Sequence, residues 1–295
     1  TFTELINTIN IYAWIIDIEF YGIESIIMQD DYISKSKCIN ISGCTINNGR
    51  VNTADYLRIC ITEYDLKIIL KAYRWKEVRI NKAYRYYKSY LPTVFIKEML
   101  SYYVGKTKLK GVVGKEEEYL YNKEQLNSFY GMIVTSPLRG TITYHNNEWG
   151  EDPIDIEEGI DKYNSSRSRF MYYPVGVFVT AIARYNLWTG ILNIGNDYVY
   201  SDTDSIKLLN YDNHKRYFEN YNNLVYRRLE KACDYHGIDI SNVIPETIKG
   251  VKKPLGVWDY DGHYKRFKTL GAKRYLYEYD NGDISLTVSG LNKKT

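Results

Sequence analysis

Two aspartates, Asp202 and Asp204, stand two residues apart between short apolar segments and could bind a divalent metal ion. The flanking segments, 198–200 and 206–209, with small polar residues between them, predict a β-hairpin with both carboxylates at its tip. In extended chain the two carboxylates would project to one side while Thr203 faces away. Carboxylate oxygens suit Mg²⁺, which keeps positions for substrate phosphates. Because Asp and Ser are ordinary turn residues, an acidic surface turn is the alternative.

A second group of polar side chains falls on one face of a predicted helix, at spacings i, i+4 and i+7. Its members are Lys123, Asn127 and Tyr130. An apolar stripe beside them would dock the helix, and it consists of Leu126, Phe129 and Ile133. A cation, an amide and an aromatic ring in a row suit a site for a triphosphate and a base, and Gly131 would allow another chain to approach closely. A generic amphipathic helix is the alternative.

A third feature is the basic stretch 249–275, which holds eight lysines and arginines against two aspartates, with aromatic residues between them. Cations and aromatics along a sheet surface would follow a nucleic-acid duplex and give salt-dependent binding. Within this stretch, strand alternation would put Lys273 and Tyr275 on one face. A solvated edge strand with charged side chains is the alternative.

Composition predicts a globular protein with a substantial core, since 25% of the 295 residues are charged and 44% are hydrophobic. The net charge of +3 is too small to indicate nucleic-acid binding by itself. The four cysteines form no CxxC pair, so a structural zinc site is not expected. The longest apolar run, 172–195, is interrupted by Pro174, Arg184 and Asn186, which favours a core helix over a membrane span.

The remaining pattern predicts strands and hairpins over 1–60, helices over 63–110 and 214–236, and an acidic solvated loop over 148–161. Asp17-Ile18-Glu19 resembles the first motif of a 3′–5′ exonuclease. The further carboxylate motifs of such a domain are missing, so we expect a strand with outward-facing acids there.

Three of these segments together resemble the motifs of family B DNA polymerases. Residues 198–205 (YVYSDTDS) resemble the C motif, 123–131 (KEQLNSFYG) the B motif and 273–275 (KRY) the KxY motif, in the family's order. The acidic insertion and residues 173–185 resemble the protein-primed subgroup of phages and linear plasmids. The resemblance implies an α+β fold: a polymerase palm, which is an antiparallel sheet with helices on one face, together with helical fingers and the subgroup's insertions.

The implied domains are palm strands with a first insertion (1–110), the fingers helix (111–135), a second insertion (136–170), the rest of the palm (171–288) and the start of a thumb (289–295). The implied activity is template-directed DNA synthesis by a two-metal mechanism, in which deoxynucleotides are added to a primer 3′-OH. Asp202 and Asp204 would hold Mg²⁺, with Mn²⁺ as a substitute, and Asp204 would be the more direct ligand.

The resemblance also implies roles for other residues. Lys123, Asn127 and Tyr130 would contact the incoming deoxynucleoside triphosphate. Primer–template DNA would be held by Lys273, Tyr275, Tyr200, Ser201 and Thr203. A terminal protein primer is a further implied partner, a membrane is not, and the site of action would be the cytoplasm of the host of a virus or plasmid.

One element of the family pattern is absent. The A motif, an Asp followed by an SLYP-like turn, does not occur in these residues. We therefore expect a partial chain that is inefficient alone and is completed by an upstream polymerase portion; Asp17 or Glu19 is a less favoured substitute ligand. The alternative function is a non-catalytic DNA-binding subunit or remnant of a split polymerase. A reverse transcriptase or RNA polymerase fits worse, because those palms carry YxDD- or GDD-like turns.

Overall fold

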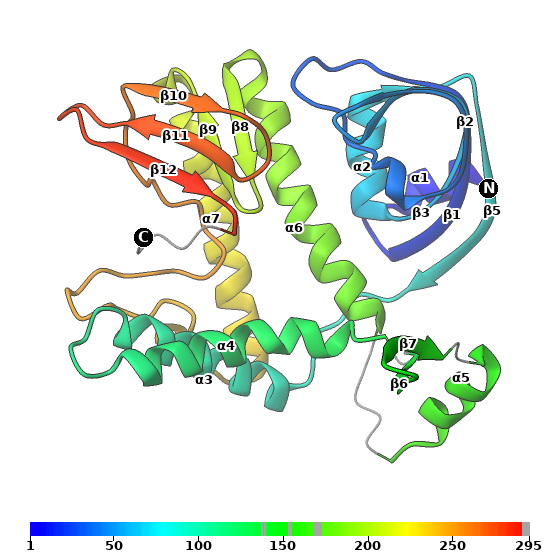
Figure 1. Cartoon of the computed structure of the whole chain (residues 1–295). Helices are drawn as coiled ribbons and strands as arrows, with labels where there is room; N and C mark the ends of the chain where they lie inside the picture. The colour runs from blue at the N-terminus through cyan, green and yellow to red at the C-terminus, as the bar shows by residue number, and fades with distance from the viewer. Residues whose placement is uncertain (137, 139, 153–154, 168–172, 291–295) are drawn as a thin grey trace. The chain divides into compact units, whose positions relative to one another are not determined.

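The computed structural model describes residues 1–136, 138, 140–152, 155–167 and 173–290 of the chain (Figure 1). These residues form two compact units. The first unit comprises Thr1–Tyr90, Ala181–Ala232 and the chain from Gly256 onward; the second comprises Leu91–Thr180 and Cys233–Leu255. The antiparallel sheets and helices described below confirm the predicted α+β class.

The first unit is built around a long antiparallel sheet. Its central strand β1 (Ala13–Ser25) pairs with β3 (Arg50–Thr62) on one side and with β4 (Tyr73–Arg74) and β5 (Glu77–Tyr86) on the other. Strand β2 (Cys38–Asn47) pairs with β3 through the predicted turn, where Asn48 and Gly49 both have positive φ, at 47° and 76°. These φ values suit a tight hairpin of this kind.

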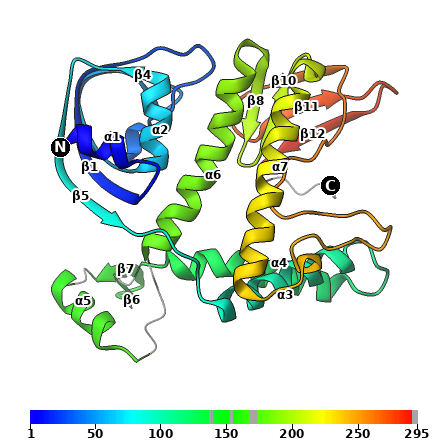
Figure 2. The same cartoon turned by 180° about the vertical axis from the view of Figure 1, so that it is seen from behind.

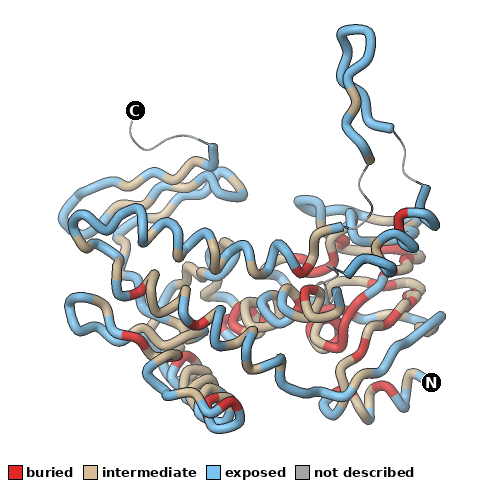
Figure 3. The backbone as a smooth tube through the Cα atoms, turned by 90° about the horizontal axis from the view of Figure 1, so that it is seen from below, coloured by how far each residue is buried: buried red, intermediate tan, exposed pale blue. Residues whose placement is uncertain are grey.

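One face of this sheet is apolar and covered by helices. Buried residues alternate along β1 and include Ile16, Ile18 and Phe20. Helix α2 (Glu63–Ala72) lies within the curve of the sheet and contributes Leu66 and other fully buried residues to the same core (Figures 1 and 2). Figure 3 shows the buried stretches of the backbone. The expectation of an antiparallel sheet with helices on one face is confirmed.

The other face of the sheet is polar and carries the two acids that resemble an exonuclease motif. Asp17 accepts two hydrogen bonds from Arg58, with Nε at 2.9 Å and a terminal nitrogen at 2.6 Å. Glu19 accepts from Asn81 at 2.9 Å and from the hydroxyls of two tyrosines. Both carboxylates therefore stand on a strand and point away from the core; Asp17 is paired with Arg58 and Glu19 is hydrogen-bonded by neutral side chains, as predicted for a structural strand.

Helix α6 (Tyr173–Ile194) also packs on this core through Trp188 and Ile191. Its first turns belong to the second unit and the rest to the first. The segment Tyr173–Asp197 is long and apolar enough to cross a membrane by length and composition, with a mean hydropathy of 1.3. Because 28% of the apolar window of that segment is buried, α6 is a core helix only in part, and one such helix is weak evidence for a membrane span.

The rest of the first unit holds a hairpin, a helix and a small sheet. Strands β8 (Tyr198–Asp202) and β9 (Ser205–Leu208) form the hairpin, and most of α7 (Tyr211–His236) follows it. Strands β10 (Arg266–Thr269), β11 (Arg274–Glu278) and β12 (Ile284–Val288) form an antiparallel three-stranded sheet. Short elements complete the unit: α1 (Phe2–Thr8), and the 3₁₀ turns η1 (Lys35–Lys37) and η2 (Gly195–Asp197).

The second unit contains an antiparallel pair of helices, α3 (Thr93–Leu109) and α4 (Glu116–Ile133). It also contains the hairpin of β6 (Thr141–His145) and β7 (Glu148–Asp152), helix α5 (Ile156–Ser165) and the turn η3 (Ile240–Asn242). Helix α5 begins at Asp155, whose carboxylate accepts from the backbone N–H groups of Glu157 and Glu158.

Three predictions of secondary structure are wrong. Helix α1 was not expected within 1–60, and 77–86 is strand β5 and not part of a helix, because pairing with β1 fixes it. The acidic segment 148–161 forms a strand and a helical start where a loop was expected, although most of its residues are exposed as predicted. Parts of the expected second insertion, at 137, 139, 153–154 and 168–170, lie outside the described residues.

One side chain fixes the segment that leads into the small sheet. Asn222 of α7 donates to the backbone oxygen of Trp258 at 2.9 Å and accepts from its backbone nitrogen at 2.8 Å. We expect Asn222→Ala to lower the free energy of unfolding by about 2 kcal/mol, because two partly buried backbone groups lose their partners. Urea denaturation measures the change. Asn223→Ala, an exposed neighbour on α7, is the control and should differ from wild type by less than about 0.5 kcal/mol.

Candidate active site

The predicted acidic hairpin is present, with both aspartates at its tip. Asp202 ends β8 and pairs with Ser205, the first residue of β9. The turn between them is not extended, since Thr203 has φ 54° and the backbone nitrogen of Asp204 donates to the carbonyl of Asp202 at 2.6 Å. The expectation that Thr203 faces away from the aspartates is therefore wrong: its hydroxyl donates to Asp202 Oδ1 at 3.0 Å.

Lys273 meets the hairpin tip directly. Its Nζ lies 2.7 Å from Asp202 Oδ1, and its backbone nitrogen donates to the hydroxyl of Tyr200 at 3.0 Å. The hydrogen bond from the Lys273 ammonium lowers the pKa of the Asp202 carboxyl. Lys273 lies in the turn before β11 with φ 56°, so the predicted strand alternation of Lys273 and Tyr275 is wrong, because the strand begins only at Arg274.

Aromatic side chains connect the hairpin to the small sheet. The ring of Tyr200 lies 5.3 Å from that of Tyr275 and 5.6 Å from that of Phe267. On the same strand, the hydroxyl of Ser201 lies 3.0 Å from that of Tyr198. Aromatic pairs at these distances pack favourably. The sequence motifs identify the two tyrosines, but they do not single out Phe267 among the aromatic residues of the basic stretch.

The base of the hairpin is held by a residue that sequence reasoning missed. Asp197 precedes β8, and its carboxylate accepts from Asn210 Nδ2 at 2.9 Å and lies 2.8 Å from His214 Nε2. Its carbonyl accepts from the backbone nitrogen of Leu209 at 2.8 Å. These contacts close the two strands at the end opposite the aspartates. No local pattern indicates them, because the partners come together only when the hairpin forms.

The donor set at the tip suits a hard cation but is incomplete. The described residues contain no cluster of three or more His, Cys, Asp or Glu side chains that could hold a metal ion. Asp204 is exposed, while Asp202 is held by Lys273. Two carboxylates with oxygen ligands left open fit Mg²⁺, which usually binds through one or two carboxylates plus substrate phosphates.

The three predicted nucleotide-binding residues lie on α4, which belongs to the second unit. Lys123, Asn127 and Tyr130 are all exposed and share one face, as expected. The apolar stripe faces α3, where the ring of Phe129 lies 5.2 Å from that of Phe95. Apart from its chain neighbours and its own helix, no described residue comes within 4 Å of the position of a Cβ at Gly131, so this glycine faces open space.

The basic stretch is divided. Residues up to Leu255 belong to the second unit and the rest to the first. Trp258 packs its ring against α7, and Arg266 pairs with Glu278 at 2.7 Å. Only its later part, from Arg266 onward, follows the predicted sheet surface.

The hairpin and the small sheet carry the segments that resemble the C and KxY motifs of family B DNA polymerases. Sequence comparison finds DNA polymerases of Bacillus phages. The chain is 29% identical to the phi29 polymerase over 159 residues, 26% identical to the Nf polymerase over 159 residues and 23% identical to the B103 polymerase over 229 residues. These matches cover 53%, 53% and 76% of this chain, and no family model matches it.

Structure comparison gives the same group. The fold matches phi29 DNA polymerase complexed with primer-template DNA and incoming nucleotide substrates, with a TM-score of 0.59 at 19% identity, over 96% of this chain and 44% of that one. The sequence matches span only 21% of the phi29 and Nf polymerases and 32% of the B103 polymerase. The resemblance to protein-primed phage DNA polymerases, predicted from the motifs, is confirmed.

Proposed function

We propose that this chain supplies the palm and fingers of a template-directed DNA polymerase that extends a primer 3′-OH with deoxynucleotides. The observation that carries the proposal is the hairpin tip: Asp202 and Asp204 stand beside Lys273, Tyr200 and Tyr275 within one compact unit.

The chain's own groups would divide the work. Lys273 and Tyr275 would hold the primer end beside the hairpin, and Tyr200, Ser201 and Thr203 would line the primer–template path. Asp202 and Asp204 would hold Mg²⁺ or Mn²⁺. Metal ions bound there would activate the attacking oxygen and stabilise the leaving pyrophosphate.

Lys273 also affects the charge of Asp202. Its Nζ lies 2.7 Å from Asp202 Oδ1 and neutralises that carboxylate. We propose that this ion pair opens when Asp202 ligates a cation, which frees the ammonium to meet a phosphate of the primer strand. Lys123, Asn127 and Tyr130 would contact the incoming nucleotide from the exposed face of α4.

The metal-binding carboxylate of the A motif is not among the 295 residues. We propose that a polymerase containing this chain takes it from a segment outside them. Such an enzyme, encoded by a phage or a linear plasmid, would act in the cytoplasm of the infected cell and would accept a terminal protein as primer. The paired state of Asp17 and Glu19 argues against their serving instead.

Primer extension tests the proposal. The 295-residue chain and a longer polypeptide that adds a segment with an A motif before it are assayed with a primer–template, deoxynucleotides and Mg²⁺. We expect little synthesis by the chain alone and template-dependent synthesis by the longer form. No synthesis by a folded longer form that carries the A motif would contradict the proposal.

A second function is a non-catalytic DNA-binding subunit. The incomplete donor set and the Lys273–Asp202 ion pair favour this second function, since Lys273 neutralises the charge of Asp202 without a metal ion. In that case the chain would bind primer–template with the same affinity in EDTA and in Mg²⁺, and the longer form would make no DNA.

A further inference from the structure

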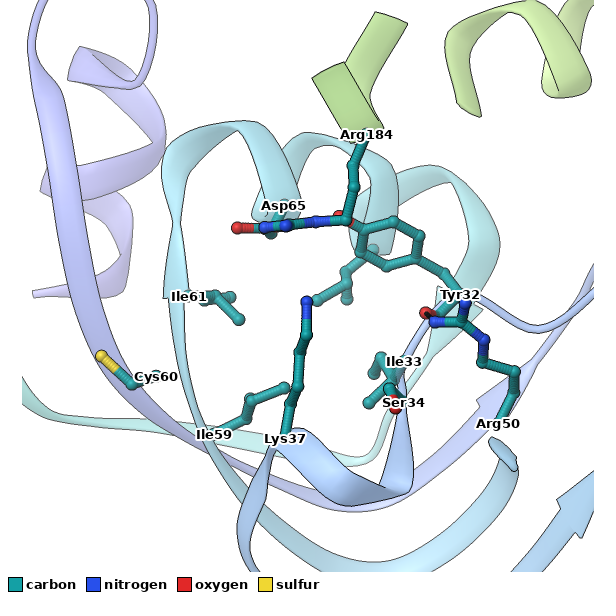
Figure 4. A pocket seen from close by; sticks show the side chains of 11 residues that line it. Tyr32, Ile33, Ser34, Lys37, Arg50, Ile59, Cys60, Ile61, Asp65 and Arg184 are labelled. Carbon is teal, nitrogen blue, oxygen red and sulfur yellow. Dashed lines mark hydrogen bonds and ion pairs between the residues drawn. The ribbon is translucent and has the colours of Figure 1, made fainter. Parts of the chain in front are cut away.

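A small pocket in the first unit lies apart from the acidic hairpin tip. It is lined by the end of the loop before β2, by β3, by α2 and by Arg184 of α6 (Figure 4). Its volume is about 40 Å³. Since a buried water needs roughly 10–15 Å³, the pocket has room for a group of a few atoms and none for a nucleoside.

Three cations and one carboxylate line this pocket: Lys37, Arg50 and Arg184, with Asp65. Arg184 is already paired, because its guanidinium lies 2.9 Å from Asp65 Oδ1. Arg50 donates one hydrogen bond to the carbonyl of Tyr32 at 3.1 Å. The remaining lining includes several isoleucines, while Lys37 and part of the Arg184 side chain stay exposed to solvent.

Among the three cations of the pocket, Lys37 is the one for which the described residues supply neither a carboxylate nor a carbonyl partner. Figure 4 shows its side chain extending from the η1 turn into the pocket, toward Arg184 and Asp65. Among the described residues, no carboxylate lies within 4 Å of its Nζ. Lys37 is exposed as a residue, but desolvation of its ammonium in the pocket, and then the nearby guanidinium of Arg184, lower its pKa. An ammonium beside two guanidinium groups and a single carboxylate is stabilised when another anion joins them.

We propose that this pocket binds a phosphate group. Arginine forks and a lysine ammonium match the oxygens of a tetrahedral oxyanion, and the hydroxyl of Ser34 on the pocket wall adds a further donor. The group can come from two sources, a free phosphate or pyrophosphate ion, or a phosphodiester of a DNA strand whose sugars and bases stay outside. The proposal rests on these residues and does not depend on polymerase activity.

Titration of the 295-residue chain tests it. Calorimetry with inorganic phosphate and with pyrophosphate, and fluorescence anisotropy with a labelled oligothymidylate, are compared for wild type, Lys37→Met and Lys35→Met. Lys35 is the matched control, because it lies in the same η1 turn and does not line the pocket. We expect Lys37→Met to weaken phosphate binding by about tenfold and Lys35→Met to leave it unchanged.

The arms distinguish the two sources. Weaker binding of phosphate and pyrophosphate alone supports a free anion, and a selective loss of oligothymidylate affinity in Lys37→Met supports a backbone phosphate. Equal behaviour of Lys37→Met and Lys35→Met toward every probe overturns the proposal. Lys37→Arg should retain binding, and thermal unfolding of each variant verifies that a loss reflects the missing charge and not misfolding.

Discussion

Asp202→Asn and Asp204→Asn are each expected to abolish DNA synthesis by a polymerase that contains this chain, with a loss of about 10³-fold or more. The amide keeps the shape of the side chain and removes the charge that would hold the metal ions, and metal stabilisation of transition-state charge contributes several kcal/mol. Primer extension under single-turnover conditions measures the loss. Asp212→Asn, an exposed residue at the start of α7, is the matched control and should retain wild-type rates.

The two variants should differ in DNA binding. Asp202→Asn removes the partner of Lys273 as well as a metal ligand, so we expect altered affinity for the primer end in EDTA. The side chain of Asp204 is exposed, and Asp204→Asn should leave that affinity unchanged. Synthesis by Asp204→Asn at a rate comparable to the wild type would show that the hairpin is not the catalytic site.

The hairpin and the helix face of α4 could be predicted from sequence because both depend on local periodicity. Alternation and turn residues over 198–209 specify paired strands with Asp at the tip, and the spacing of Lys123, Asn127 and Tyr130 places them on one side of any helix. The conformation of the tip could not be predicted. Thr203 and Lys273 both adopt positive φ, which non-glycine residues rarely do, and Lys273 contacts Asp202 and Tyr200, which precede it by 71 and 73 positions.

Contacts between segments far apart in the chain could also not be predicted from the sequence. Strand β5 was misassigned because its aromatic and basic residues suit a helix or an edge strand, and only pairing with β1 selects the strand. Arg184 was recognised as an interruption of an apolar run, but its partner Asp65 lies 119 positions earlier. The local sequence pattern therefore does not predict the pocket in which Lys37 lies beside that pair.

The Asp65–Arg184 pair leads to the second large effect, which is on stability. The Asp65 side chain is only 7% exposed, and its Oδ1 accepts from Arg184 Nε at 3.2 Å and from the hydroxyl of Tyr32. Its Oδ2 accepts from the backbone nitrogen and the hydroxyl of Thr62, at 3.0 and 2.7 Å, in the capping box that begins α2. One carboxylate thus joins α2 and α6 and caps a helix.

We expect Asp65→Ala to lower the free energy of unfolding by about 3–5 kcal/mol, since it leaves the Arg184 charge and the Tyr32 hydroxyl without partners in the interior. Chemical denaturation measures this. Glu24→Ala is the control, because Glu24 makes a similar pair with Arg74 on the surface, where both side chains are about half exposed or more. That exposed pair should contribute less than about 1 kcal/mol.

The pH dependence follows from the environment of Asp65. Burial raises the pKa of this carboxyl, but the Arg184 guanidinium and the hydrogen bonds from Tyr32 and Thr62 outweigh it, so the pKa lies below the ordinary value. The stabilisation is therefore fully present above about pH 4 and is lost as the pH falls through the lowered pKa. Denaturation of wild type and Asp65→Asn between neutral pH and pH 2 should show a stability difference that shrinks in acid. A difference that stays constant over this range would mean that Asp65 acts through packing and not through its charge.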